Sequence, residues 1–458
     1  MFAKAQRVHF IGIGGIGMSG IAEILLNLGY AVSGSDLRLT SVTERLTALG
    51  ATVFAGHVEA NVIGSGVVVA SSAVSPQNPE ILEARRRKIP VIPRAEMLAE
   101  LMRIKYGIAV AGMHGKTTTT SMIACVLAAG GLDPTVVVGG RVDAIGSNAR
   151  LGRSQYLVAE ADESDRSFLK LSPILSVVTN IDREHMDCYR DMADVEAAFI
   201  EFIDRVPFYG ACTVCLDDPR LATLLPRVTR RVLTYGLSHL ADYAVRLLPS
   251  EGVGARFEVA YAGDVLGPFA LHVPGRHNVL NAAAAIAIGT QLEVAGESIA
   301  RALEGYRGVD RRFQTKGAVR GVTVVDDYGH HPAEIAATLL AARDCGFRRV
   351  HVIFQPHRYT RTRDLMPEFA AVLREADSVQ VLDVYAAGEE PISGIDARAL
   401  VRACGRDAVV YAEGFAGAAR QAIAQASEGD VVLTLGAGNI SQVAALALEE
   451  LETSPPGG

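Results

Sequence analysis

The residues whose types and spacing are most suited to chemistry form the segment Gly112-Met113-His114-Gly115-Lys116-Thr117-Thr118. An apolar run at 108–111 predicts a short buried strand before it, and the residues from 117 to 129 predict a helix after it. A glycine loop at a helix start directs backbone N–H groups toward the positive end of the helix dipole, where phosphate binds. The lysine of such a loop contacts the β- and γ-phosphates, and the hydroxyl that follows is a ligand for Mg²⁺. The segment therefore predicts a nucleoside triphosphate site.

This loop departs from the usual phosphate-binding pattern at one position. The pattern G-x-x-x-x-G-K-T has its first glycine where this chain has Val110. The alternative is a glycine-rich turn that only caps a helix, but such a turn leaves the pair Lys116-Thr117 unexplained. We interpret the segment as a variant phosphate loop.

Acidic residues and a histidine follow the next predicted strands of the same segment. The run Glu160–Asp165 holds four carboxylates after the strand 155–159, and His185 lies in the loop after the strand 174–179. The carboxyl ends of parallel strands share one edge of a sheet, which is where ligands bind in open α/β sheets. Glu160 is therefore a candidate ligand for Mg²⁺ beside the phosphate loop.

Each of these two clusters has an ordinary structural alternative. Four carboxylates so close together repel one another unless a cation or a basic partner lies among them, and a solvated acidic turn is the alternative for 160–165. A single histidine is usually neutral and structural, whereas one flanked by Asp and Glu in a loop is a better candidate for a metal ligand or a phosphate contact. The residues alone leave the role of His185 open.

Two asparagines near an alanine-rich predicted helix, 279–288, form another candidate contact. Asn278 and Asn281 are spaced so that they share one face of a helix. Their amides are suited to pairing with the edge of an adenine. Helix N-capping is the alternative for Asn278.

Polar side chains also follow predicted strands in the last third of the chain. They lie in the stretches 326–332, 354–362 and 383–385. Arg358 and Arg361 are suited to holding a carboxylate or a phosphate with two hydrogen bonds. A polar rim above an apolar sheet predicts a binding face.

A second glycine loop stands near the start of the chain. The residues from Gly12 to Gly17 match G-x-G-x-x-G between a predicted strand, 7–11, and a helix that runs through Leu28. The next predicted strand ends near Asp36, and an acidic residue at that distance contacts the ribose of a dinucleotide. Taken alone, this segment predicts NAD binding.

The elements that must position these residues alternate strand and helix along the whole chain, which predicts mostly parallel sheets. At 458 residues we expect three α/β domains. The N-terminal one, 1–104, is Rossmann-like, the central one, 105–308, is a P-loop-type ATPase domain, and the C-terminal one, 309–458, is again Rossmann-like.

Composition excludes several classes of protein. A net charge of −7 argues against a nucleic-acid-binding protein, which needs a basic surface. The N-terminus has no signal-peptide core, and uncharged stretches are too short to span a membrane. The pair Cys212 and Cys215 lies in an apolar run without further metal ligands nearby, so we expect structural cysteines, a reducing compartment and a cytoplasmic protein.

Taken together, the motifs resemble the Mur ligase family. They are G-x-x-G-K-T-T-T, E-A-D-E-S-D, T-N-I-D-x-E-H-M-D, H-N-x-x-N-A and D-D-Y-G-H-H-P, in this order, with G-I-G-G-I-G-M-S-G before them and F-Q-P-H-R-Y-T-R-T after them. The resemblance covers nearly the whole chain. It implies ATP-dependent joining of L-alanine to the lactyl carboxylate of UDP-N-acetylmuramate through an acyl phosphate, with Mg²⁺, or Mn²⁺ in its place. It also implies that the first glycine loop holds a UDP-sugar and not NAD.

The resemblance assigns site residues in all three domains. The UDP-sugar would be bound by Gly14, Gly15, Ile16, Gly17, Met18, Ser19, Asp36, Ser71 and Ser72. ATP would be bound by Gly112, Met113, His114, Gly115, Lys116, Thr117 and Thr118, with Asn278, Asn281, Arg312 and Asp327. The amino acid would be bound by Tyr328, His357, Arg358 and Arg361. Lys116, Glu160 and His185 would be catalytic, with Thr117, Glu160 and His185 as the metal ligands.

Two alternatives remain open at this point. A related ligase that attaches a preformed murein peptide to the same sugar nucleotide would share most of these motifs. An NAD-dependent oxidoreductase would explain the first glycine loop, but it leaves Lys116, Glu160 and His185 without a role. Monomer and dimer are both compatible with the sequence.

Overall fold

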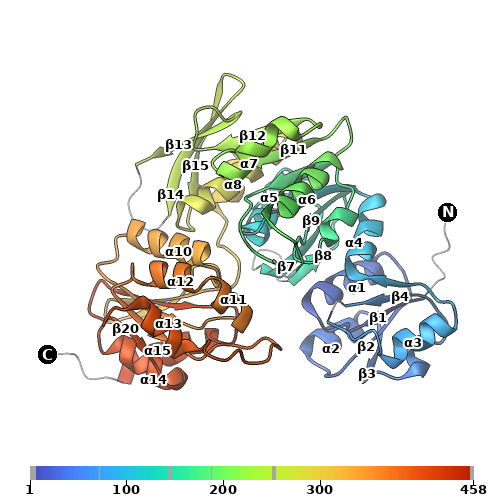
Figure 1. The fold of residues 1–458 in the computed structure, drawn as a ribbon. Helices are drawn as coiled ribbons and strands as arrows, with labels where there is room; N and C mark the ends of the chain where they lie inside the picture. Colours follow the sequence, from blue (N-terminus) through green and yellow to red (C-terminus); the bar gives the residue numbers. More distant parts are fainter. Residues whose placement is uncertain (1–6, 72, 143–146, 187, 250–253, 454–458) are drawn as a thin grey trace. The chain divides into compact units, whose positions relative to one another are not determined.

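The computed structural model describes residues 7–71, 73–142, 147–186, 188–249 and 254–453. These residues form sheets of five, ten and six strands (Figure 1). Packing divides the chain into two compact units. The first holds Met1–Leu247, Phe257–Phe269 and Leu280–Tyr306, and the second holds Leu248–Arg256, Ala270–Val279 and Arg307–Gly458.

The N-terminal sheet is parallel, with the strand order β3-β2-β1-β4-β5. Its strands are β1 (Arg7–Ile11), β2 (Val32–Asp36), β3 (Thr52–Ala55), β4 (Ser65–Ala70) and β5 (Val91–Pro93). Its helices are α1 (Ile16–Asn27), α2 (Ser41–Ala48), η1 (Glu59–Val62), α3 (Pro79–Arg86) and α4 (Arg94–Arg103). The strand order reverses direction between β1 and β4, so the glycine loop after β1 stands at the switch point where such sheets bind ligands.

The central sheet has the order β15-β14-β13-β12-β11-β10-β6-β9-β7-β8. Its strands are β6 (Tyr106–Ala111), β7 (Thr135–Val142), β8 (Ser147–Arg150), β9 (Tyr156–Glu160), β10 (Leu175–Val178), β11 (Ala211–Cys215), β12 (Val232–Gly236), β13 (Tyr243–Leu248), β14 (Ala255–Tyr261) and β15 (Asp264–Leu271). The helical segments are α5 (Lys116–Ala129), η3 (Ser167–Lys170), α6 (Met192–Asp204), α7 (Pro219–Leu224), η4 (Leu225–Arg227), α8 (Arg276–Gln291) and α9 (Gly296–Glu304). Strand β6 runs parallel to β9 and β10 on its two sides, so the loops after these three strands emerge together.

The C-terminal sheet has the order β16-β17-β21-β18-β19-β20, in which β16 pairs antiparallel to β17 and the other strands are parallel. Its strands are β16 (Gln314–Val319), β17 (Val322–Asp327), β18 (Val350–Phe354), β19 (Ser378–Val381), β20 (Val409–Tyr411) and β21 (Val431–Leu435). Its helices are α10 (Pro332–Asp344), α11 (Tyr359–Asp364), α12 (Met366–Leu373), α13 (Ala397–Cys404), α14 (Gly414–Ile423) and α15 (Ser441–Thr453). Alternate residues of the strands enter separate apolar cores on the two faces, with Phe354 in one core and Ile353 in the other.

The predicted three-domain α/β class is confirmed, and some local expectations were wrong. Helix α8 begins at Arg276 and not at residue 279, so Asn278 lies inside the helix and does not cap it. The N–H of Asn278 bonds to the carbonyl of Gly275, whose φ of +97° makes the turn into the helix. The proposed domain limits, 1–104, 105–308 and 309–458, stay a prediction. Among the described residues, no helix is both long enough and apolar enough to cross a bilayer.

Candidate active site

The phosphate loop joins β6 to α5 and requires glycine at two positions. Gly112 has a φ of +131°, and a Cβ there would lie 2.0 Å from Thr179 Oγ1. Gly115 has a φ of +83° and is the N-cap of α5. A Cβ on Gly115 would lie 2.8 Å from Asn281 Oδ1. Only glycine fits both the left-handed backbone and the close approach, so the loop is held tightly against its neighbours.

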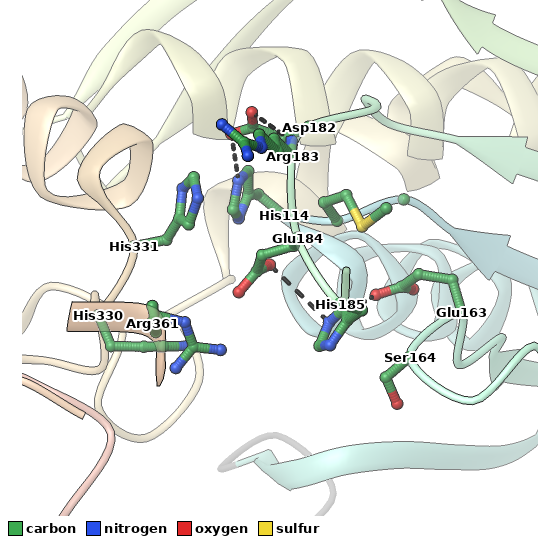
Figure 2. A network of polar contacts seen from close by, with 12 residues as sticks. His114, Glu163, Ser164, Asp182, Arg183, Glu184, His185, His330, His331 and Arg361 are labelled. Atoms are coloured by element: carbon green, nitrogen blue, oxygen red, sulfur yellow. Dashed lines mark hydrogen bonds and ion pairs between the residues drawn. The ribbon is translucent and has the colours of Figure 1, made fainter. Parts of the chain in front are cut away.

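Residues after β10 hold the phosphate loop in place. Asn180 Oδ1 accepts from the N–H of His114 at 2.9 Å, and Asn180 Nδ2 donates to the carbonyl of His114 at 2.9 Å. Thr179 Oγ1 donates to the same carbonyl at 2.6 Å. The ring of His114 contacts Asp182 Oδ2 at 3.0 Å through Nε2 (Figure 2). The loop after β10 was expected to lie beside the phosphate loop, and this is confirmed. Hydrogen bonds between His114 and both Thr179 and Asn180 join the two loops.

Lys116 of the phosphate loop forms an ion pair with Glu163, which follows β9. Lys116 Nζ donates to Glu163 Oε1 at 2.8 Å and to the carbonyl of Gly112 at 2.7 Å. Glu163 has no exposed surface. Burial raises the pKa of Glu163 to about 7, although the lysine opposes that rise. Burial lowers the pKa of Lys116, but the combined attraction of Glu163, Glu160 and Asp162 outweighs it and the net pKa is raised, so the lysine keeps its charge at neutral pH.

The acidic run after β9 is solvated only in part, because Asp165 is exposed whereas Glu163 is buried. Glu160 Oε1 and Glu163 Oε2 are both buried and accept no hydrogen bond from the described residues. The basic partners that a cluster of carboxylates needs are Lys116 for Glu163 and Arg94, which lies 3.3 Å from Asp162. Buried carboxylate oxygens without donors are costly unless a cation occupies the space beside them. Glu160 Oε1 is therefore an acceptor that remains open to a donor or to a cation.

His185 follows β10 and lies beside the acidic run. Its Nε2 lies 3.5 Å from Glu163 Oε1 and 3.9 Å from Glu184 Oε2. Figure 2 shows His185 between these two carboxylates. The backbone of His185 has a φ of +55°, a strained value for a residue with a side chain. The structure thus brings Lys116, Glu163 and His185 together, with Glu160 on the strand end beside them.

Asp36, at the end of β2, forms a hydrogen bond with the first glycine loop. Asp36 Oδ2 accepts from the N–H of Gly14 at 2.9 Å. Gly15 is the N-cap of α1, so the N–H groups of the first helical turn point out of the loop. Several other predicted UDP-sugar ligands lie around this loop: Ile16 and Gly17 begin α1, Met18 and Ser19 follow with buried side chains, and Ser71 follows β4. Ser72 lies outside the described residues.

In the C-terminal sheet, aromatic rings and arginines meet beyond the strand ends. The ring of His357 stacks on Tyr385 with 5.5 Å between centroids, and His330 lies 5.7 Å from His357. Arg361 Nη1 lies 3.2 Å from His357 Nδ1. The N–H of Arg358 donates to the carbonyl of Tyr385 at 2.8 Å. Burial and the neighbouring cations lower the pKa of His357 to about 4.

Arg312 and Asp327, which the resemblance assigns to ATP, have partners within this unit. Asp327 Oδ2 accepts from the N–H of Phe313 at 2.7 Å, and Asp327 Oδ1 accepts from the N–H of Gly329 at 2.8 Å. The guanidinium of Arg312 lies 5.1 Å from the ring centroid of Tyr328. Asp327 therefore shapes the turn after β17 in this structure.

The two asparagines occupy different environments. Asn281 Oδ1 accepts from Thr119 Oγ1 at 3.0 Å, which ties α8 to α5 behind the phosphate loop. Asn278 Nδ2 donates to the carbonyl of Pro274 at 2.6 Å. Sequence reasoning did not single out Glu163 or Asn180 as site residues. The acidic run contained Glu163, but no pattern shows which of its carboxylates is buried against the lysine.

Comparisons with known proteins agree with this architecture. The model described as Mur ligase family, catalytic domain, matches residues 7–106. The Mur ligase middle domain matches residues 110–289, and the model described as Mur ligase, glutamate ligase domain, matches residues 311–438.

Several relatives that match nearly the whole length of this chain share one name. The UDP-N-acetylmuramate–L-alanine ligase of Acidobacterium capsulatum is 69% identical over 457 residues, with 100% of each chain covered. The ligase of the same name from Koribacter versatilis is 62% identical over 461 residues, with 98% of each chain covered. The crystal structure of the UDP-N-acetylmuramate–alanine ligase from Thermotoga maritima is 31% identical, with a TM-score of 0.79 over 98% of this chain and 100% of that one. The chain therefore belongs to the Mur ligase family.

Proposed function

We propose that this protein joins L-alanine to the lactyl carboxylate of UDP-N-acetylmuramate and converts ATP to ADP and phosphate. The observation that carries the proposal is the phosphate loop, whose Lys116 is paired with the buried Glu163, with two buried carboxylate oxygens beside it. This arrangement suits the phosphoryl transfer that activates a carboxylate. The relatives that match over the whole length support the choice of sugar nucleotide and amino acid.

The chemistry proceeds in two steps. A lactyl carboxylate oxygen forms a bond to the γ-phosphorus of ATP as the bond to the β,γ-bridging oxygen breaks, which gives an acyl phosphate and ADP. The amine of L-alanine then forms the C–N bond, phosphate leaves from the tetrahedral intermediate, and the amine loses a proton. Lys116 lies within the loop that would hold the phosphates, so it is placed to stabilise charge as it moves to the bridging oxygen.

We assign the metal positions to residues that fit a divalent cation. Thr117 in the first turn of α5 and Glu160 at the end of β9 would hold one Mg²⁺, and His185 would contribute to a second. A bound Mg²⁺ would neutralise charge on the phosphate oxygens during transfer. The unpartnered Glu160 Oε1 supports this assignment.

The remaining contacts divide among the domains as follows. The Gly14–Ser19 loop with Asp36, Ser71 and Ser72 would bind the UDP-sugar. Asn278 and Asn281 would contact the adenine, and Arg312 and Asp327 the nucleotide. Tyr328, His357, Arg358 and Arg361 would surround L-alanine. We also place the reaction in the cytoplasm, because Cys212 and Cys215 are buried free thiols, which fits a reducing compartment.

A coupled assay of phosphate release distinguishes this function from its alternatives. Purified protein is given ATP, Mg²⁺ and UDP-N-acetylmuramate, with either L-alanine or the murein tripeptide as acceptor. We expect turnover with L-alanine far above turnover with the tripeptide. Faster turnover with the tripeptide would favour the peptide ligase over the L-alanine ligase.

A further inference from the structure

Arg311 occupies the centre of the carboxyl edge of the C-terminal sheet, and none of the functional assignments above includes it. Its Nη2 donates to the carbonyl of Gly436 at 2.6 Å, and its Nη1 donates to the carbonyl of Gly438 at 3.1 Å. Its Nε lies 3.2 Å from Asp326 Oδ2. All three guanidinium nitrogens are therefore engaged at once, which fixes the plane of the group.

The same residue also holds Tyr328. The carbonyl of Arg311 accepts from the N–H of Tyr328 at 2.7 Å, and its guanidinium lies 5.1 Å from the ring centroid of Tyr328. Arg311 therefore links the end of β17 to the loop after β21. Strands β17 and β21 are neighbours in the sheet. The guanidinium group contacts both segments through three nitrogens, and lysine, which has a single side-chain nitrogen, cannot make all of these contacts.

The loop held by Arg311 packs closely against the end of the next strand, β18. A Cβ on Gly436 would lie 2.8 Å from the carbonyl oxygen of Gln355, and a Cβ on Gly438 would lie 2.5 Å from Gln355 Oε1 and 2.8 Å from the ring of Tyr385. Tyr385 in turn stacks on His357. A shift of this loop would therefore move Tyr385 and, with it, the histidine.

The backbone of Arg311 is itself strained. Its φ is +60°, in the left-handed region that costs a residue with a side chain free energy. Such strain persists only where surrounding contacts fix the conformation. Here those contacts are the guanidinium bonds and the Tyr328 N–H, all on the rim where the amino acid is expected.

We propose that Arg311 is a positioning residue for L-alanine, which acts by fixing Tyr328 and the Gly436–Asn439 loop in the arrangement that receives the amino acid. This inference rests on the proposed function. Small displacements of positioning groups reduce the rate of a reaction strongly. Loss of Arg311 should therefore weaken use of L-alanine more than use of UDP-N-acetylmuramate, whose predicted site lies in the other unit.

The test compares Arg311→Met and Arg311→Lys with a matched control, Arg349→Met. Arg349 makes the same kind of contacts at the opposite edge of the same sheet, with Nη2 3.0 Å from Asp430 Oδ2 and 2.8 Å from the carbonyl of Gln425. KM and kcat are measured for each of the three substrates in the full-length enzyme, and thermal melts record the stability of each variant. Wild-type turnover with L-alanine is established first, so that failure of the proposed function is seen separately.

We expect Arg311→Met to raise the KM for L-alanine about tenfold or more, with the KM for UDP-N-acetylmuramate changed by less than about twofold. The KM of Arg311→Lys for L-alanine should be close to that of Arg311→Met, because lysine restores the positive charge but not the several N–H donors of the guanidinium group. Arg349→Met should lower the melting temperature and leave the KM for L-alanine unchanged. An unchanged KM for L-alanine in a folded Arg311→Met enzyme, or an equal rise in Arg349→Met, overturns the proposal. If Arg311→Met does not fold, the KM of Arg311→Lys for L-alanine is compared with that of Arg349→Met in its place.

Discussion

Lys116 shows how the proposed nucleotide site is prepared before a nucleotide binds. A buried carboxylate and two loop carbonyls, those of Gly112 and Met113, hold its ammonium group within the phosphate loop. The lysine therefore loses little conformational entropy when it turns to a phosphate oxygen. The cost of this arrangement is a carboxylate buried at Glu163, whose raised pKa reflects poor solvation.

Replacing Lys116 with alanine tests this role directly. We expect kcat to fall by a factor of about 10²–10³ or more, because the charge that develops during transfer loses its main protein partner. Stopped assays of ADP formation measure the effect. Lys105→Ala is the control, because Lys105 donates to the carbonyl of Ser154 and lies outside the loop. Near-normal turnover in the Lys116→Ala enzyme would contradict the assignment.

His357 gives the C-terminal unit a pH dependence whose sign follows from its low pKa. Burial and the nearby His330, Arg361 and Arg358 lower this pKa from 6.5 to about 4. Between these two values the unfolded chain binds more protons at this residue than the folded chain does. The contribution of His357 therefore makes the free energy of unfolding rise with pH from about 4 to 6.5, and stability is lost as the pH falls through this range.

We expect His357→Gln to reduce this pH dependence. The melting temperatures of wild type and variant should converge as the pH falls from 6.5 toward 4, relative to their difference at pH 7.5. Differential scanning fluorimetry across this range provides the measurement. His239→Gln, a substitution of an exposed histidine, should follow the wild-type curve. Parallel curves for wild type and His357→Gln would show that the histidine does not titrate in this way.

At the scale of elements, the connection β6–loop–α5 was predictable because three independent signals agree. The apolar run of β6, the two glycines and the buried helix that follows all place the loop between Ala111 and Lys116. The helix α11 was missed, because its sequence, from Tyr359 to Asp364, is polar and has no apolar face for a periodicity to reveal. Strand β16 was missed for a similar reason, since four of its six residues are polar or glycine and it pairs only along one edge.

Gly112 follows β6 and packs against Thr179, which follows β10, so a substitution at Gly112 tests how closely the two loops must approach. Gly112→Ala would place a methyl group 2.0 Å from Thr179 Oγ1 on a backbone with φ +131°. The loops after the two strands would have to separate, so we expect ATP affinity to fall by at least about tenfold and stability to fall by about 1–3 kcal/mol. Isothermal titration with a non-hydrolysable ATP analogue and chemical denaturation measure the two effects.

Gly131→Ala provides the matched comparison at the other end of α5. Gly131 also has a positive φ, +78°, but a Cβ there would have no neighbour within 4 Å. This variant should lose about 1 kcal/mol of stability and keep its affinity for the ATP analogue. Equal affinities in the two variants would mean that the close contact with Thr179 does not shape the nucleotide site.

At the scale of the whole molecule, sequence reasoning identified three domains, but it could not identify what holds each site together. Asp36 was expected to contact a ligand, and in the structure it accepts from the N–H of Gly14. Asp327 was expected to approach ATP, and it accepts from the N–H of Phe313, just before β16, and from the N–H of Gly329 in the turn after β17. Such contacts join residues far apart in the sequence, or depend on local turns, and no periodicity or motif spacing reports them.

The division of ligands among domains predicts separable patterns of protection across the molecule. Amide hydrogen exchange, followed by mass spectrometry on the full chain, is measured with an ATP analogue and Mg²⁺ or with UDP-N-acetylmuramate alone. We expect the ATP analogue to slow exchange in 112–121, where backbone N–H groups would bind phosphate, and the UDP-sugar to slow exchange in 14–19. Lys116→Ala should weaken the first effect and leave the second intact. Slowed exchange in 14–19 with the ATP analogue alone, and none with UDP-N-acetylmuramate, would reverse the assignment of the two glycine loops.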